Sequence, residues 1–248
     1  MSFLVQSAPE WLLTLLLFLM LRNRAYRVCP CFFSYVAFGV AAGVARFATY
    51  NHPGLYFATY WTTEAGYCIL GILAMHEVFR AAVRARIWWS YVIFPSIVIV
   101  GVGLSLARAH AAPPQFSGLR YYIVVGEIAV RFVQVIMFVG MGVHAAVFGS
   151  RWRPYFLGIA AGFGFFAAVA LPMTMKFSDL GTRFRFFWGR ILIAAYSVAV
   201  LIWIWFFRAP QPEESPLGPE LPLDANPLNQ YRDRPKQAAP VAGLPTAA

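Results

Sequence analysis

Long apolar runs separated by short polar segments dominate the chain and predict membrane-spanning helices. A helix needs about 20 predominantly apolar residues to cross the hydrocarbon core of a bilayer. Six runs reach this length, and the polar segments between them are short. The predicted spans cover residues 31–50, 56–79, 87–107, 121–148, 154–175 and 187–207.

A seventh apolar run lies at the N-terminus, with its densest part at residues 11–21. This part alone is too short to cross a bilayer, so the helix is predicted to begin near Phe3 and to include Glu10. No basic residue precedes the run, and three arginines follow it, which is the reverse of a secretory signal peptide. We therefore expect this segment to stay attached, with the N-terminus outside.

The distribution of arginine and lysine predicts the orientation of the spans, because cytoplasmic loops carry an excess of these cations. With the N-terminus outside, twelve cations fall on the inner side: Arg22, Arg24, Arg27, Arg80, Arg84, Arg86, Arg151, Arg153, Arg208, Arg232, Arg234 and Lys236. Five fall on the outer side: Arg108, Arg120, Lys176, Arg183 and Arg185. We therefore predict an all-α membrane protein, a seven-transmembrane-helix bundle with its N-terminus outside and its C-terminus cytoplasmic.

The composition agrees with a membrane protein. Hydrophobic residues make up 60% of the 248 residues and charged residues only 12%, against roughly 25% charged in soluble domains. The net charge of +10 comes from short clusters between apolar runs. We therefore expect the lipid bilayer, and no nucleic acid, as a partner.

The composition changes abruptly after Arg208. Residues 209–248 contain nine prolines with scattered charges, which is typical of a disordered, proline-rich segment. We therefore divide the chain into a transmembrane domain, residues 1–208, and a disordered cytoplasmic tail, residues 209–248. The tail contains no recognisable effector domain, so a signal would have to pass to a cytoplasmic protein that docks on it.

Small residues four positions apart let membrane helices approach closely. Gly39 and Gly43 have this spacing in one predicted span, and Gly158 and Gly162 have it in another. We expect them to serve packing within the chain rather than dimerisation. The three cysteines form no disulfide or metal-binding pattern, and we expect no specific role for the segment 29–31, Cys-Pro-Cys.

Charged residues inside the spans gather in the predicted outer half. At about 1.5 Å per residue, Glu64 lies about 12 Å below the outer edge of its helix. A charge at the bilayer centre costs about 2.5–3.5 kcal/mol on insertion scales, so these side chains are expected to face inward and to pair. The set comprises Glu10, Arg46, Glu64, Glu127, Arg131 and Arg190.

Helical spacing predicts which of these residues share a face. Tyr56, Tyr60, Glu64 and Tyr67 follow one another at steps of four, four and three, so they line one side of a helix.

The same spacing predicts the ion pairs. Glu127 and Arg131 are one turn apart, and Gln134 continues their stripe. Across helices, Glu64 is expected to contact Arg46 or Arg131.

Three interpretations of this charged region remain open. It is a closed ion-pair network that fixes helix register, an outward-open pocket for a small polar or anionic molecule, or part of a proton or ion path. The path interpretation lacks a chain of carboxylates that reaches the inner face. The candidate ligand-binding residues are Arg46, Tyr60, Glu64, Tyr67, Glu127, Arg131 and Arg190.

At the predicted inner end, Glu77 is expected to pair with Arg80 or Arg84. His76 and His144 lie at similar depth on different spans, and two such histidines could ligate a haem iron. The alternative function is therefore a membrane haem-binding electron carrier.

Several catalytic classes lack the residues that they need. A retinal protein requires a lysine in the last span, which contains none. The aspartates Asp179, Asp224 and Asp233 lie outside the predicted spans, so a paired-aspartate protease is not supported. The four histidines are too dispersed for a metal-dependent hydrolase. We expect no enzymatic activity, no cofactor and no metal.

Three pieces of the chain carry a resemblance to a family. They are Arg24-x-x-Arg27-x-x-Pro30-x-Phe32-x-x-Tyr35, Tyr56-Phe57-x-x-Tyr60-Trp61-x-x-Glu64 and Glu77-Val78-Phe79-Arg80. They resemble a family of bacterial seven-helix membrane proteins of about this length and of no known activity. The resemblance covers the spans but not the tail, and it implies a bundle in the bacterial cytoplasmic membrane. The resemblance implies no function; the outer polar region and the tail without an effector domain favour a non-enzymatic receptor-like or accessory protein.

Overall fold

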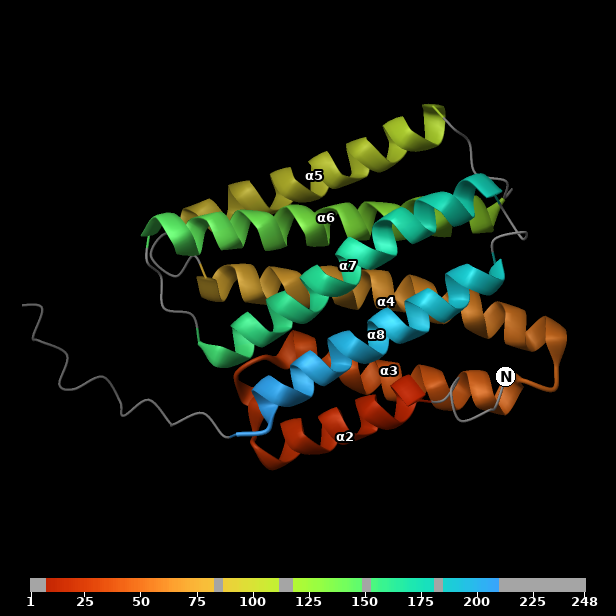
Figure 1. Ribbon diagram of the computed structural model, residues 1–248, viewed down its shortest axis with the longest axis horizontal. Helices are drawn as coiled ribbons and strands as arrows, with labels where there is room; N and C mark the ends of the chain where they lie inside the picture. The colour runs from red at the N-terminus through yellow and green to blue at the C-terminus, as the bar shows by residue number, and fades with distance from the viewer. Residues whose placement is uncertain (1–7, 83–86, 112–117, 149–152, 181–184, 210–248) are drawn as a thin grey trace, which may run out of the picture. The chain divides into compact units, whose positions relative to one another are not determined.

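The structure is a computed structural model that describes residues 8–82, 87–111, 118–148, 153–180 and 185–209, and all regular structure within them is helical. The α-helices are α2 Ala8–Arg22, α3 Pro30–Thr49, α4 Pro53–Ala82, α5 Ile87–Ala111, α6 Leu119–Phe148, α7 Pro154–Leu180 and α8 Arg185–Phe207. A short 3-10 helix, η1 (Ala25–Arg27), lies between α2 and α3. Consecutive helices run in opposite directions (Figure 1).

Six of these helices, α3 to α8, contain a segment long and apolar enough to cross a membrane. They indicate a multi-pass membrane protein. Helix α2 has 15 described residues, so it is about 22 Å long and shorter than the roughly 30 Å hydrocarbon core. The predicted start of the first span near Phe3 lies outside the described residues, as does the predicted tail beyond residue 209.

Helix packing follows the antiparallel order of the chain. Helix α7 packs along α8, α5 along α6, and α3 along α4, while α2 lies against both α8 and α3. Glycines allow two of these close approaches, as predicted. A methyl group on Gly43 of α3 would lie 2.8 Å from the side chain of Glu10 on α2, and one on Gly162 of α7 would collide with the indole of Trp203 on α8.

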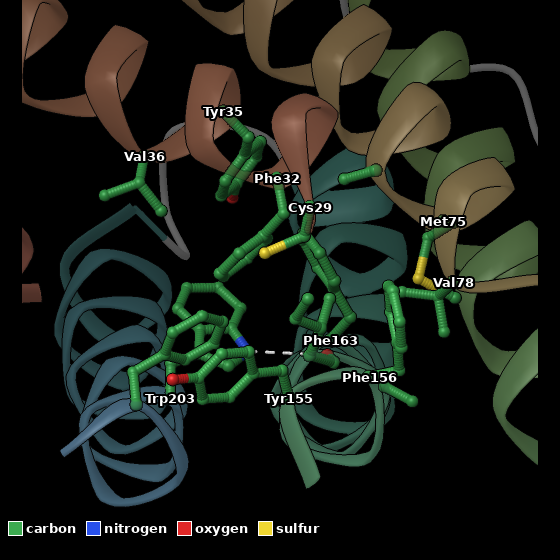
Figure 2. Close-up of a cluster of buried hydrophobic side chains, with 14 of the residues drawn as sticks. Cys29, Phe32, Tyr35, Val36, Met75, Val78, Tyr155, Phe156, Phe163 and Trp203 are labelled. Atoms are coloured by element: carbon green, nitrogen blue, oxygen red, sulfur yellow. Dashed lines mark hydrogen bonds between the residues drawn. The ribbon is translucent and has the colours of Figure 1, made fainter. Parts of the chain in front are cut away.

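A cluster of aromatic side chains, here called the aromatic core, fills one end of the bundle. Its members are Phe32, Tyr155, Phe163, Trp203 and Phe207, all at most 2% exposed. The ring of Phe32 meets that of Trp203 edge to face at 5.1 Å, and the rings of Tyr155 and Phe207 stack at 4.4 Å. The indole nitrogen of Trp203 donates to the carbonyl of Ile159, as Figure 2 shows. This end is therefore closely packed.

The aromatic core comes from the first half of α3, the first half of α7 and the last turns of α8. Because neighbouring helices are antiparallel, the opposite end of the bundle is formed by the end of α3 and the first turns of α4 and α6. The charged residues singled out by the sequence lie toward that opposite end.

Candidate functional site

Arg46 and Glu64 form an ion pair between α3 and α4. Nη2 of Arg46 lies 2.8 Å from Oε1 of Glu64, and both side chains are about one-fifth exposed. Nε of Arg46 donates to the hydroxyl of Thr63 at 2.8 Å, and the guanidinium lies 4.7 Å from the centre of the Tyr60 ring. Of the two partners predicted for Glu64, Arg46 is the one in contact, and acceptors and a ring face surround its guanidinium.

Thr63 is a member of this site that the sequence analysis missed. Its side chain is buried, its hydroxyl donates to the carbonyl of Thr59, and it accepts from Arg46. A threonine next to an acid in an apolar helix could have indicated this site, but the direction of the Thr63 side chain depends on how α3 and α4 meet.

The predicted face of phenols on α4 is present over more than two turns. The rings of Tyr56 and Tyr60 stack with centres 6.5 Å apart. Further along the helix, Tyr67 donates to the carbonyl of Gly39 at 3.4 Å, and its ring lies 5.6 Å from that of Tyr35. Because Gly39 has no side chain, α3 leaves room for the Tyr67 hydroxyl.

Glu127 and Arg131 do not form the predicted one-turn ion pair. Among the described residues, the ion pairs within 4.0 Å are Arg46–Glu64 and Arg108–Asp179. The carboxyl of Glu127 lies beside that of Glu64 instead. Nη1 of Arg131 donates to Oε1 of Gln134 at 2.9 Å. The i+4 spacing was favourable, but cross-helix neighbours determine where both side chains lie.

Arg190 was predicted to face inward, but its side chain is exposed on the second turn of α8. Near a helix end, a long arginine side chain can reach the polar interface, so burial is not required. Glu10 is also exposed and lies over Gly43. The charged cluster is therefore Arg46, Glu64, Glu127 and Arg131.

Polar side chains continue from this cluster toward the middle of the bundle. Gln134 on α6 is 1% exposed and Tyr35 on α3 is 4% exposed. Tyr196 on α8 lies beside Tyr35 and stacks obliquely on Phe166 of α7 at 5.2 Å. Beyond Tyr35 the interior becomes the aromatic core, with Phe163 at 5.1 Å from its ring. The polar region thus ends inside the bundle.

Glu77 has a different role from the predicted ion pair with Arg80 or Arg84. Its two carboxylate oxygens accept hydrogen bonds from the backbone N–H groups of Cys31, at 3.2 Å, and Phe32, at 3.0 Å. The side chain of Arg80 is exposed, and Arg84 lies outside the described residues. Since these N–H groups belong to the first turn of α3, Glu77 on α4 caps that helix.

The segment 29–31 belongs to this cap, contrary to the expectation that it has no specific role. Pro30 is the first residue of α3, and the preceding Cys29 supplies no side-chain cap. The Cys29 thiol is fully buried and donates to the carbonyl of Ala25 at 3.2 Å. Burial, reinforced by the negative charge of Glu77, raises the pKa of this thiol. Cys29 is therefore held as a neutral packing residue.

The proposed haem ligands cannot both be placed. The ring of His76 packs against Phe94 with centres 4.7 Å apart, and the side chain of His144 lies outside the described residues. Within the part of the chain that the structure describes, no group of three or more histidine, cysteine or acidic side chains is arranged to hold a metal ion. Haem binding stays a prediction.

An open surface hollow lies between α5 and α6. It is lined by Leu106, Ala107, Ala109, His110 and Tyr121, at the end of α5 and the start of α6. The lining is mostly apolar and contains no member of the charged cluster. The hollow is therefore not part of the candidate site.

No family model, curated protein or solved structure matches this chain.

Proposed function

We propose that the chain is a receptor-like, non-enzymatic membrane protein that binds a small polar molecule at the charged cluster. In this proposal seven helices span the bacterial cytoplasmic membrane, with the N-terminus outside and the C-terminus in the cytoplasm. The excess of arginine on one side supports the orientation. The cluster then lies in the outer half, where a molecule from outside the cell could reach it.

One observation carries the binding proposal: the charged cluster is only partly paired. The four ionisable side chains of the charged cluster lie in candidate spans, yet a single close ion pair, Arg46–Glu64, joins them in the described part of the chain. A network that served only helix register would be expected to satisfy every charge, because an unpaired charge inside a membrane is costly. Incomplete pairing is expected of a binding site, because the bound ligand supplies the missing partner.

The one-sided interior also supports this function. Polar side chains end at the aromatic core, which closes the interior toward the other end of the bundle. A molecule held at the cluster would not cross, so the arrangement suits sensing better than transport. A signal would pass to a cytoplasmic protein docked on residues 209–248.

A ligand screen tests the binding proposal. Purified protein in nanodiscs is heated with a panel of small neutral, cationic and anionic polar molecules, and the melting temperature is recorded. At least one molecule should stabilise the wild type. Glu64→Gln should raise the concentration of that molecule needed for half-maximal stabilisation at least tenfold. Glu10→Gln, which removes an exposed acid at the same end of the bundle, is the control. If Glu64→Gln only lowers the melting temperature and no molecule stabilises the wild type, a closed structural network is the better interpretation.

Reporter fusions test the topology. Alkaline phosphatase, which is active only outside the cytoplasm, should be active after residue 112 and inactive after residue 209. Activity after residue 209 would contradict seven spans with an external N-terminus.

A deletion tests docking on the tail. Deletion of residues 209–248 should abolish recovery of a cytoplasmic partner in a pull-down, whereas unchanged recovery would exclude docking on the tail.

A further inference from the structure

Arg131 lies near the middle of its candidate span. It follows Arg120, the first residue of that span, by 11 positions, which corresponds to about 16 Å along the helix. Its guanidinium lies 4.4 Å from the centre of the Phe166 ring on α7, and its side chain is half-buried. A cation at this depth needs compensation, because charge is most costly near the bilayer centre.

The compensation of Arg131 is incomplete. One of its nitrogens donates to Gln134, but the buried Nε has no hydrogen-bond partner. Among the described residues, no carboxylate lies within 4.0 Å of it. Arg46 in the same bundle provides the comparison, because its Nε bonds Thr63 and its Nη2 bonds Glu64. The two arginines therefore differ in that only Arg46 has a counter-ion in contact.

A second poorly satisfied donor lies near Arg131. The hydroxyl of Tyr196 is buried and makes no hydrogen bond of normal geometry, and its recorded polar neighbour is a weak acceptor, the phenol of Tyr35. Phe166 links the two sites, since its ring contacts both the guanidinium of Arg131 and the ring of Tyr196. Guanidinium groups only donate hydrogen bonds, and a phenol donates readily to an anion. The missing partner is therefore an acceptor with negative charge.

We propose that Arg131 and Tyr196 bind a small monovalent anion, a carboxylate or a halide, between α6, α7 and α8. This inference rests on the proposed function and names the class of ligand that the inner part of the binding site would hold. Arg131 supplies the charge and the Nε donor, Tyr196 supplies a hydroxyl donor, and Phe166 supplies an apolar wall. The ion would complete the pairing that Glu127 does not provide.

Anion titrations at constant ionic strength test the inference. Protein in nanodiscs is titrated with sodium acetate or sodium chloride, exchanged against sodium sulfate, and the melting temperature is recorded. Saturable stabilisation is expected in the wild type. Arg131→Gln should abolish it, and Tyr196→Phe should weaken the apparent affinity about tenfold. The separate acetate and chloride arms tell a carboxylate site from a halide site.

Arg120→Gln is the matched control, because Arg120 also lies over a ring, that of Phe57 at 4.3 Å, but is exposed at the start of α6. It should retain the full anion response. If Arg131→Gln does not fold, Tyr196→Phe alone decides, since that change removes only one oxygen. An absent response, or an equal response in wild type and Tyr196→Phe, overturns the inference. The proposed function would survive that result if a neutral or cationic molecule stabilised the protein through Glu64, and both would fail if nothing did.

Discussion

The Oε2 atom of Glu77 on α4 lies 3.0 Å from the backbone nitrogen of Phe32 on α3. The other carboxylate oxygen accepts from the preceding N–H group in the same turn, that of Cys31. One side chain therefore satisfies two amides at a helix start that has no cap of its own. Because Phe32 belongs to the aromatic core, this cap also positions a central ring of that core.

Removing the cap should destabilise the bundle. Glu77→Ala leaves two backbone donors without their acceptor, and a lost cap costs about 1–2 kcal/mol. Glu77→Gln keeps one oxygen acceptor and should cost less. Unfolding in a series of detergent mixtures measures both variants. Arg80→Ala is the control, and an equal loss in Arg80→Ala and Glu77→Ala would restore the ion pair predicted from the sequence.

The ion pair between Arg46 and Glu64 should show energetic coupling. In a double-mutant cycle with Arg46→Gln and Glu64→Gln, the coupling free energy of unfolding should be about 1–3 kcal/mol, since the two groups touch. The double variant should therefore be more stable than the sum of the two single effects predicts. Coupling near zero would mean that the two charges act independently.

Thr63 can be compared with its neighbour Thr62. Both hydroxyls donate to a carbonyl one turn earlier on α4, but only that of Thr63 also accepts from Arg46. Thr63→Val should therefore lower the melting temperature and weaken any ligand response, whereas Thr62→Val should leave both unchanged. A similar effect in the two variants would mean that the hydrogen bond to the α4 backbone, which both threonines make, accounts for the loss of stability, and not the contact with Arg46.

Gly162 should not tolerate a methyl group. Its added Cβ would collide with the indole of Trp203, and overpacking of this kind costs about 1–3 kcal/mol. Gly140 on α6 has open space around the same position, so Gly140→Ala should be neutral or stabilising by up to about 1 kcal/mol. Thermal unfolding of the two variants compares them directly. Equal stability would show that α7 and α8 do not approach closely at this point.

Cys29 should resist alkylation in the folded protein. Its thiol is buried, hydrogen-bonded and held neutral by a raised pKa, and the thiolate is the reactive form. In a variant that keeps only this cysteine, maleimide labelling should be slow at neutral pH and should become rapid only after unfolding. Raising the pH into the ordinary thiol range should accelerate labelling of an exposed thiol much more than that of Cys29. Fast labelling without unfolding would contradict the burial.

The spans were predictable because hydrophobicity alone determines where a chain can enter a bilayer. The prediction of 31–50 corresponds to α3, Pro30–Thr49, and that of 154–175 falls within α7, Pro154–Leu180. Helices extend past the apolar runs, as α4 does to Ala82, because interfacial residues continue the backbone hydrogen bonding. The seven-span count remains part of the proposal, since α2 is described only from Ala8.

The charged side chains were predictable as a group but not as partners. Glu64 was expected to contact Arg46 or Arg131, and of these two it pairs with Arg46. The partners of Glu77 and Arg131 depend on rotation of neighbouring helices, which spacing along one helix does not specify. Backbone acceptors and donors, such as the first turn of α3, leave no sign in side-chain composition.

The end of α8 is anchored from two sides. Asn23, just after α2, donates to the carbonyl of Phe207 at 2.6 Å, and Tyr155 in the first turn of α7 donates to the carbonyl of Ala209 at 3.1 Å. A pull on the chain beyond this point would therefore strain the turn between α2 and α3 and the start of α7 together. The C-terminal end of α8 is therefore held in place instead of rotating freely. Tension applied there would be transmitted to α2, α3 and α7 at once.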